Sequence, residues 1–189
     1  MSRESSFSKY YGYLSKSPIG SVPCLIPETT RAMEYLPQPI THKKVLDAGC
    51  GQGGWTVALR GSGYEVTAVD LDTSQFPEAV KADLHELPFE DNQFDIVFCT
   101  GAFEHCFAPF IVLSEFKRVS RNGGAILITL PTEDNIPLLE DAGHYCSMSR
   151  LQMERMYLKK LSLALQHYER VFLDPVVGEH QIFIIKVQK

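Results

Sequence analysis

The sequence has none of the long apolar runs that mark membrane proteins. No stretch approaches the ~20 consecutive apolar residues that a membrane-spanning helix needs. The opening stretch, MSRESSFSKYYGY, also lacks the apolar core of a signal peptide. We therefore expect a cytoplasmic protein without a membrane partner.

Paired cysteines and an excess of basic residues are missing as well. The 5 cysteines contain no C-x-x-C pair, which argues against a zinc site or a disulfide framework and favours reduced thiols. The net charge of −5 offers no broad basic surface for phosphates, which disfavours nucleic acid as a partner. What remains is an ordinary globular composition, 44% apolar and 22% charged over 189 residues, which suits one domain.

The first part of the chain differs from the rest. Residues 1–41 are polar and aromatic, and prolines interrupt them repeatedly, at Pro18, Pro23, Pro27, Pro37 and Pro39. We expect this segment to be an N-terminal lid or flank, and residues 42–189 to form the single domain.

From Lys44 onward, apolar strand-like runs alternate with amphipathic helical ones. This alternation is typical of a parallel α/β sheet. Strands are predicted at 44–49, 65–71, 94–101 and 125–131, and helices at 53–63 and 109–121.

The C-terminal part follows another pattern. Residues 149–165 predict one long helix, and two strand-like runs, ERVFLDPVV and HQIFIIKVQ, come after it. Only Gly178 and Glu179 join these runs, and a two-residue join permits an antiparallel hairpin but no parallel pair.

The stretch VLDAGCGQGGWT is a glycine-rich turn between a strand and a helix, and it can be read in two ways. Gly49, Gly51 and Gly54 match the G-x-G-x-x-G of a dinucleotide-binding turn. Asp47, with Gly49, Gly51 and Gly53, matches the D-x-G-x-G-x-G of an S-adenosylmethionine (AdoMet) loop. Both ligands contain a ribose, which Asp70 at the end of the next strand could bind.

Asp47 favours AdoMet. An acid near the end of a buried strand must be paired or must face a cation. AdoMet carries an ammonium and a sulfonium, whereas NAD offers only the charge of its nicotinamide ring, which is bound elsewhere.

Four blocks in order, VLDAGCGQGG, AVDLD, ADLHELPFEDNQFDIVFCTGAFEHC and LSEFKRVSRNGGAILITLP, resemble the class I AdoMet-dependent methyltransferases. The similarity is to their small single-domain group, like the ubiquinone and menaquinone pathway enzymes. It implies an α/β fold of three layers, Rossmann-like, with a seven-stranded, mostly parallel sheet and an antiparallel C-terminal hairpin.

The resemblance also implies which residues bind the AdoMet cofactor. They are Asp47, Gly49 and Gly51 around the methionine part, with Cys50 and Gly53 in the same loop; Asp70 on the ribose, followed by Leu71; Asp83 and Leu84 at the adenine edge; Cys99 and Thr100 beside the methyl group; and Tyr11 in an N-terminal segment folded over the cofactor.

Methyl transfer from a sulfonium needs alignment above all, and an O–H or N–H acceptor also needs a general base. The candidate bases are His105 and His144. Some relatives bind a divalent metal through E-x-x-E-H and a later histidine, and Glu104, His105 and His144 would be that set here. Gly101 replaces the first carboxylate, and local pairing of Glu104 and His105 is the competing interpretation.

The sequence thus predicts an AdoMet-dependent methyltransferase acting on a small-molecule acceptor through O, N or C. A non-catalytic AdoMet-binding partner subunit is the first alternative, favoured by Gly101-Ala102 and by the short connection between Asp70 and Ala82. An NAD(P)-dependent oxidoreductase is the second, but it would need a catalytic set, and Leu161 stands where Y-x-x-x-K would place its lysine after Tyr157.

Overall fold

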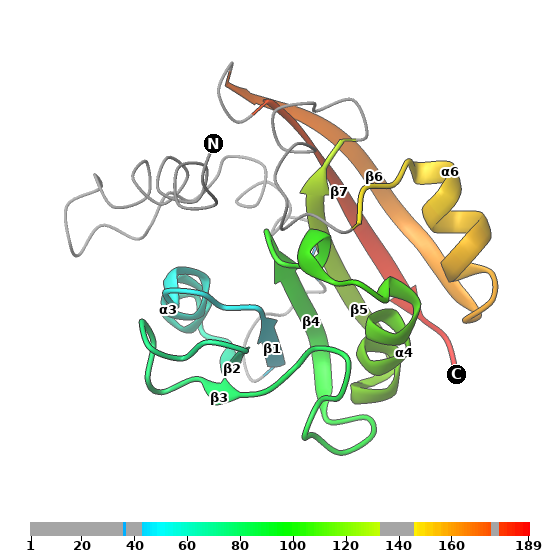
Figure 1. Ribbon diagram of the computed structural model, residues 1–189. Helices are drawn as coiled ribbons and strands as arrows, with labels where there is room; N and C mark the ends of the chain where they lie inside the picture. The colour runs from blue at the N-terminus through cyan, green and yellow to red at the C-terminus, as the bar shows by residue number, and fades with distance from the viewer. Residues whose placement is uncertain (1–35, 37–42, 133–145, 175–177) are drawn as a thin grey trace.

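A seven-stranded sheet organises the computed structural model, which describes Leu36 and residues 43–132, 146–174 and 178–189 (Figure 1). Its strand order is β3-β2-β1-β4-β5-β7-β6. The five strands β1 to β5 pair in parallel, while β7 runs antiparallel to both β5 and β6. The strands are β1 (Lys44–Ala48), β2 (Glu65–Asp70), β3 (Val80–Lys81), β4 (Phe94–Thr100), β5 (Ser120–Pro131), β6 (Leu163–Asp174) and β7 (Gly178–Val187).

Helices cover both faces of this sheet and produce the predicted three layers. Side chains of neighbouring positions in each strand point to opposite faces, so Leu46 packs toward α4 and Val45 packs toward α3. The helical elements are α3 (Gly54–Gly61), the 3₁₀ helix η1 (Phe103–His105), α4 (Pro109–Val119), α6 (Arg150–Gln152) and the π-helix η2 (Met153–Leu158) that continues α6. The predicted sheet, hairpin and layering are therefore confirmed.

The described connection between β2 and β3 holds no helix, and β3 is only 2 residues long. The few residues between Asp70 and Ala82 leave no room for more than this short strand and its loop. Residues 1–41, predicted as a lid or flank, lie outside the described residues except for Leu36. Its side chain is buried against Leu59 on the α3 side of the sheet.

The single long helix predicted over 149–165 is wrong. Ser149 and Gln152 form a capping box that starts α6, and the helix then widens into η2, which ends at Leu158. Ser162, with a left-handed φ of 54°, reverses the chain, and Leu163 begins β6. The leucines of LSLAL fit a helical stripe and an alternating strand equally well, and pairing with β7 decides for the strand.

The predicted join of the hairpin is also misplaced, although its antiparallel pairing is confirmed. Gly178 and Glu179 are the first residues of β7 and pair with Asp174 and Phe172 of β6. Two irregularities, between Leu165 and His167 and between Phe172 and Asp174, shift the register along β6.

Gln181 joins three elements in the interior. Its side chain is fully buried on β7, where Nε2 donates to the carbonyls of Pro131 (3.1 Å) and Met148 (2.9 Å). Its Oε1 accepts a hydrogen bond from the Tyr168 hydroxyl on β6. One amide thus ties the end of β5, the segment before α6 and the edge strand together.

We expect Gln181→Met to lower the free energy of unfolding by about 3 kcal/mol, because it leaves two buried carbonyls and a hydroxyl without this partner. Tyr168→Phe is the matched control, since it removes only one of the three bonds and should cost about 1 kcal/mol. Urea unfolding followed by circular dichroism measures both, and equal losses would contradict the role given to the amide.

Candidate active site

The carboxyl ends of β1, β2 and β4 meet at one edge of the sheet, where the strand order reverses between β1 and β4 (Figure 1). In open α/β sheets, ligands bind in the crevice outside such a reversal point. The glycine loop of residues 49–53, which leads from β1 into α3, lies at this edge. The segment after β3 and the turn after β4 border the same place.

The glycine loop adopts a backbone that other residues resist. The φ angles of Gly49, Gly51 and Gly53 are 79°, 52° and 77°, all in the left-handed region. A Cβ on Gly49 would lie 2.3 Å from the Cβ of Ala102, and one on Gly53 would lie 2.4 Å from the Phe76 ring. The loop therefore needs glycine both for its turn and for its close approach to neighbouring segments.

Asp47 lies beneath this loop and is almost fully buried, with 2% of its surface exposed. The Thr56 hydroxyl in the first turn of α3 donates to its Oδ2 at 2.5 Å. Burial raises the pKa of Asp47 to about 6, against the opposing effect of the Thr56 hydrogen bond. A cation placed next to such a buried carboxyl would stabilise its ionised form.

Asp70 connects the end of β2 to the glycine loop. Its Oδ2 accepts from the Gly51 amide at 2.8 Å, and its Oδ1 accepts from the Asp72 amide at 2.9 Å. Each carboxylate oxygen has a second lone pair, so both oxygens can still accept from a ligand hydroxyl. Leu71, which follows, exposes 66% of its surface.

Asp83 and Leu84 follow β3 and reach the same edge. The Leu84 side chain lies 3.9 Å from the position of a Cβ on Gly49, which places this pair beside the glycine loop. Arg118 of α4 secures the segment that follows, since its guanidinium donates to the carbonyls of Leu87 and Phe89.

Cys99 and Thr100, the two cofactor-binding residues predicted at the end of β4, lie in different environments. The Cys99 side chain is fully buried in the core on the α4 side, where burial raises its thiol pKa well above the usual value. Thr100 is half-buried at the strand end. In the loop, Cys50 has a pKa raised to about 12, mainly by burial, so neither thiol is a nucleophile at neutral pH.

Glu104 and His105 stand in η1, just after the turn at Gly101. Glu104 is only 5% exposed, and its Oε2 has no hydrogen-bond partner among the residues that the structure describes. Its charge adds to the raised thiol pKa values of Cys106 and Cys146, which burial mainly causes. Gly101 has a left-handed φ of 63°, so a carboxylate residue would be strained at that point.

Two predicted site residues, Tyr11 and His144, lie outside the described residues. Within the described ranges there is no group of three His, Cys, Asp or Glu side chains suited to a metal ion. The set Glu104, His105 and His144 stays a prediction, because one of its members is not described. Over the same ranges, no helix is long and apolar enough to cross a membrane.

The sequence interpretation missed three contributors to this edge. They are Thr56, which holds Asp47; Ala102, which must be small beside Gly49; and His85, whose side chain binds Asp83. The regular spacing of α3 places Thr56 on its buried face and could have indicated it. Nothing in the sequence pattern indicates the contact of Ala102 with the loop.

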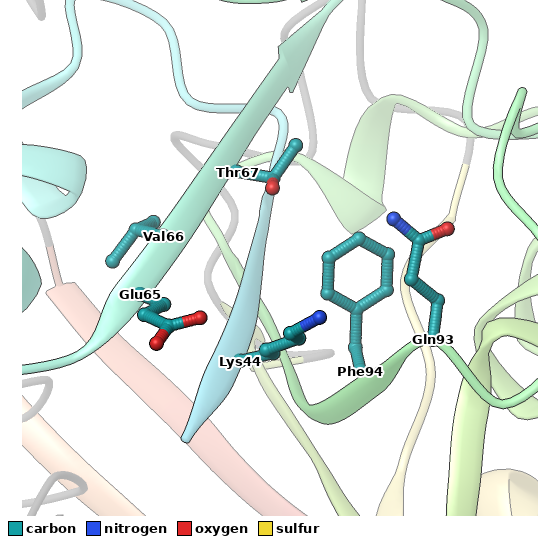
Figure 2. Close-up of a pocket in the computed structure, with 6 residues that line it drawn as sticks. All are labelled: Lys44, Glu65, Val66, Thr67, Gln93 and Phe94. Atoms are coloured by element: carbon teal, nitrogen blue, oxygen red, sulfur yellow. The ribbon is translucent and has the colours of Figure 1, made fainter. Parts of the chain in front are cut away.

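A separate pocket opens at the opposite edge of the sheet (Figure 2). It is lined by the first residues of β1, β2 and β4, namely Lys44, Glu65 and Phe94, together with Val66, Thr67 and Gln93. These positions are at the amino ends of the strands, away from the glycine loop, so this pocket is no part of the candidate active site.

The glycine loop, Asp47 and Asp70 lie within residues 46–128, and this range matches the family described as "Methyltransferase domain". Over these residues the chain matches a methyltransferase domain, as the four sequence blocks predicted. The roles of the individual site residues stay predictions.

Named relatives agree with this assignment. A malonyl-[acyl-carrier protein] O-methyltransferase of Enterobacter lignolyticus is 36% identical over 108 residues, covering 52% of this chain and 43% of the relative. A demethylmenaquinone methyltransferase of Staphylococcus aureus is 31% identical over 112 residues, covering 51% of this chain and 46% of that one. The chain therefore spans about half the length of these relatives.

A solved structure shares the fold over nearly the whole of this chain. The 1,6-didemethyltoxoflavin-N1-methyltransferase of Burkholderia thailandensis superimposes with a TM-score of 0.72 at 18% identity, covering 99% of this chain and 87% of that one. It contains 1,6-didemethyltoxoflavin and S-adenosylhomocysteine.

We expect Gly49→Ala to lower the free energy of unfolding by at least about 3 kcal/mol, because it adds a Cβ clash to a left-handed backbone. Adding Ala102→Gly to this variant should relieve the clash and leave a loss of about 1–2 kcal/mol from backbone strain. Gly61→Ala is the control, since its Cβ would meet nothing within 4 Å, and it should be neutral or slightly stabilising. If Ala102→Gly recovers nothing in urea unfolding, the proposed close approach is wrong.

The buried Asp47 should also make stability fall as the pH rises. Its pKa is about 6 in the folded protein against 3.8 for an ordinary aspartate, so between these values folding takes up a proton that rising pH removes. Stability due to this group should drop by about 3 kcal/mol across that window. Asp47→Asn cannot titrate, so the difference in unfolding free energy between wild type and variant should decline over the same range. A difference independent of pH would contradict the burial of a titrating carboxyl.

Proposed function

We propose that the protein transfers the methyl group of AdoMet to a small-molecule acceptor. The observation that carries the proposal is the buried carboxyl of Asp47 beneath a left-handed glycine loop that Asp70 holds from the other side. A pyrophosphate placed there would meet two carboxylates, whereas the ammonium and sulfonium of AdoMet would be attracted. This distribution of charge argues against the NAD(P)-dependent alternative.

Residues of the glycine loop and of the strand ends around it would contact AdoMet along its length. Asp47 would hold the ammonium of the methionine part, because a cation beside this buried carboxyl stabilises its ionised form. Asp70 would accept from the ribose hydroxyls, and Asp83 from the amino group of adenine. Left-handed glycines let the backbone approach the ligand between these points.

Bound AdoMet supplies a methyl group on a sulfonium, which is a good leaving group for in-line displacement. The protein's part is to align the acceptor and to exclude water, and it needs no covalent intermediate. Where the acceptor carries an O–H or N–H, His105 or His144 would take its proton. Glu104 in the neighbouring position has a buried oxygen with no partner in the described part of the chain, and it is a further candidate for orienting that base or the acceptor.

The acceptor is the finer part of the proposal. The relatives are named for O-methylation of malonyl-acyl-carrier protein and for methylation of demethylmenaquinone, which supports a small organic acceptor. The proposed division into a flank at 1–41 and a domain at 42–189, and the cytoplasmic location, stay predictions from the sequence.

Calorimetric titration with AdoMet and with NAD tests the cofactor. We expect AdoMet to bind and NAD not to bind, and Asp47→Asn to weaken AdoMet by at least about tenfold, because the ligand ammonium loses its charged partner. Asp72→Asn is the matched control, since Asp72 is exposed at the neighbouring turn and should bind normally. Binding of NAD without AdoMet would overturn the proposal.

Turnover is then followed as S-adenosylhomocysteine released with a panel of carboxylic acid, phenol, quinone and amine acceptors. Activity with one of these classes that falls in His105→Ala would assign the base. AdoMet binding without turnover on any of them would favour the non-catalytic partner subunit.

A further inference from the structure

His85 makes two hydrogen bonds of opposite direction with its two ring nitrogens. Nδ1 lies 2.6 Å from Oδ1 of Asp83, and Nε2 accepts from the backbone amide of Ala108 at 3.2 Å. The ring stacks on Phe107 with a centroid distance of 4.1 Å and an angle of 21°. His85 thus links the segment after β3 to the residue just before α4.

This arrangement fixes the protonation of the ring. The Ala108 amide can only donate, so Nε2 must be the unprotonated nitrogen. Nδ1 therefore carries the proton and donates it to Asp83. The His85 side chain is 14% exposed, which leaves little water to compete for either nitrogen.

His85 holds only one of the two carboxylate oxygens of Asp83. Its Oδ1 accepts from both the His85 amide (2.9 Å) and the His85 ring, and these bonds keep the pKa of Asp83 below its usual value. Among the described residues, Oδ2 has no hydrogen-bond partner, and half of the side chain remains exposed. One oxygen is thus fixed while the other stays free to accept from a ligand, on the residue next to Leu84, whose side chain lies beside the glycine loop.

We propose that His85 is the positioning residue that makes the site select a 6-aminopurine, because it holds Asp83 so that Oδ2 faces the adenine edge of AdoMet. This inference rests on the function proposed above. A carboxylate held in one orientation accepts a hydrogen bond from the 6-amino group of adenine. The same carboxylate repels the 6-oxo oxygen of a hypoxanthine, because both atoms are acceptors.

If His85 had a purely structural role, a different one of its two hydrogen bonds would matter. In that case the important bond is the one to Ala108, which fixes the start of α4. The two bonds can be separated by substitution because they involve nitrogens at different distances from the backbone.

Three variants separate them. His85→Asn places an amide donor near the position of Nδ1 but is too short to reach Ala108. His85→Gln places a carbonyl acceptor near the position of Nε2 but leaves no donor near Asp83. His85→Ala removes both bonds.

The measurement is the ratio of affinities for S-adenosylhomocysteine and S-inosylhomocysteine, by calorimetry, alongside urea unfolding. We expect the Asn variant to keep the wild-type preference for S-adenosylhomocysteine. In the Gln and Ala variants this affinity ratio should be about tenfold smaller. The free energy of unfolding should rank the variants differently. The Gln variant should stay close to wild type, because it keeps the bond to Ala108, and the Asn and Ala variants should be less stable. In wild type, ¹⁵N spectra of the imidazole should show the proton on Nδ1.

If the affinity ratio ranks the three variants in the same order as their stability does, the proposal is overturned, because His85 would then act only through its bond to Ala108. Two further results separate this failure from others. An Asp83→Asn variant with an unchanged ratio would remove the adenine role of Asp83. A wild type that binds neither nucleoside would instead overturn the proposed function.

Discussion

The close approach of two turns is the constraint on which the candidate site depends. The loop after β1 and the turn after β4 meet where Gly49 faces Ala102, with no room for another methyl group between them. Because these turns follow adjacent central strands, their separation is set by the strand spacing of the sheet. Small residues at both positions let the backbone itself form the floor of the site.

Three aspartates at this edge have different environments and so suit different ligand groups. Asp47 is buried and resists ionisation, whereas hydrogen bonds from His85 favour the ionised form of Asp83. Asp70 is occupied by two backbone amides and completes the loop. A buried acid suits a cation, and exposed, oriented acids suit neutral hydrogen-bond donors.

Much of this architecture could be predicted from the sequence, because strand and helix periods are local properties. The strands at Phe94 and Glu65 and the helix at Pro109 follow directly from apolar patterning. The stretch around Leu163 could not be assigned in this way, since its leucines suit both periods and only pairing with β7 decides. The contacts of Ala102 and of His85 with its partners depend on segments distant in the chain, which no single local pattern specifies.

The two edge strands of the sheet differ in how readily they could pair with another copy of the chain. Strand edges with free amides and carbonyls can pair with another copy, and long flat edges are the most prone to do so. At one end β3 offers only 2 residues, too few to form a continuous ladder. At the other end β6 is long, but its two register irregularities bend it and interrupt the regular spacing of its outward groups. Both edge strands are therefore poor templates for extending the sheet.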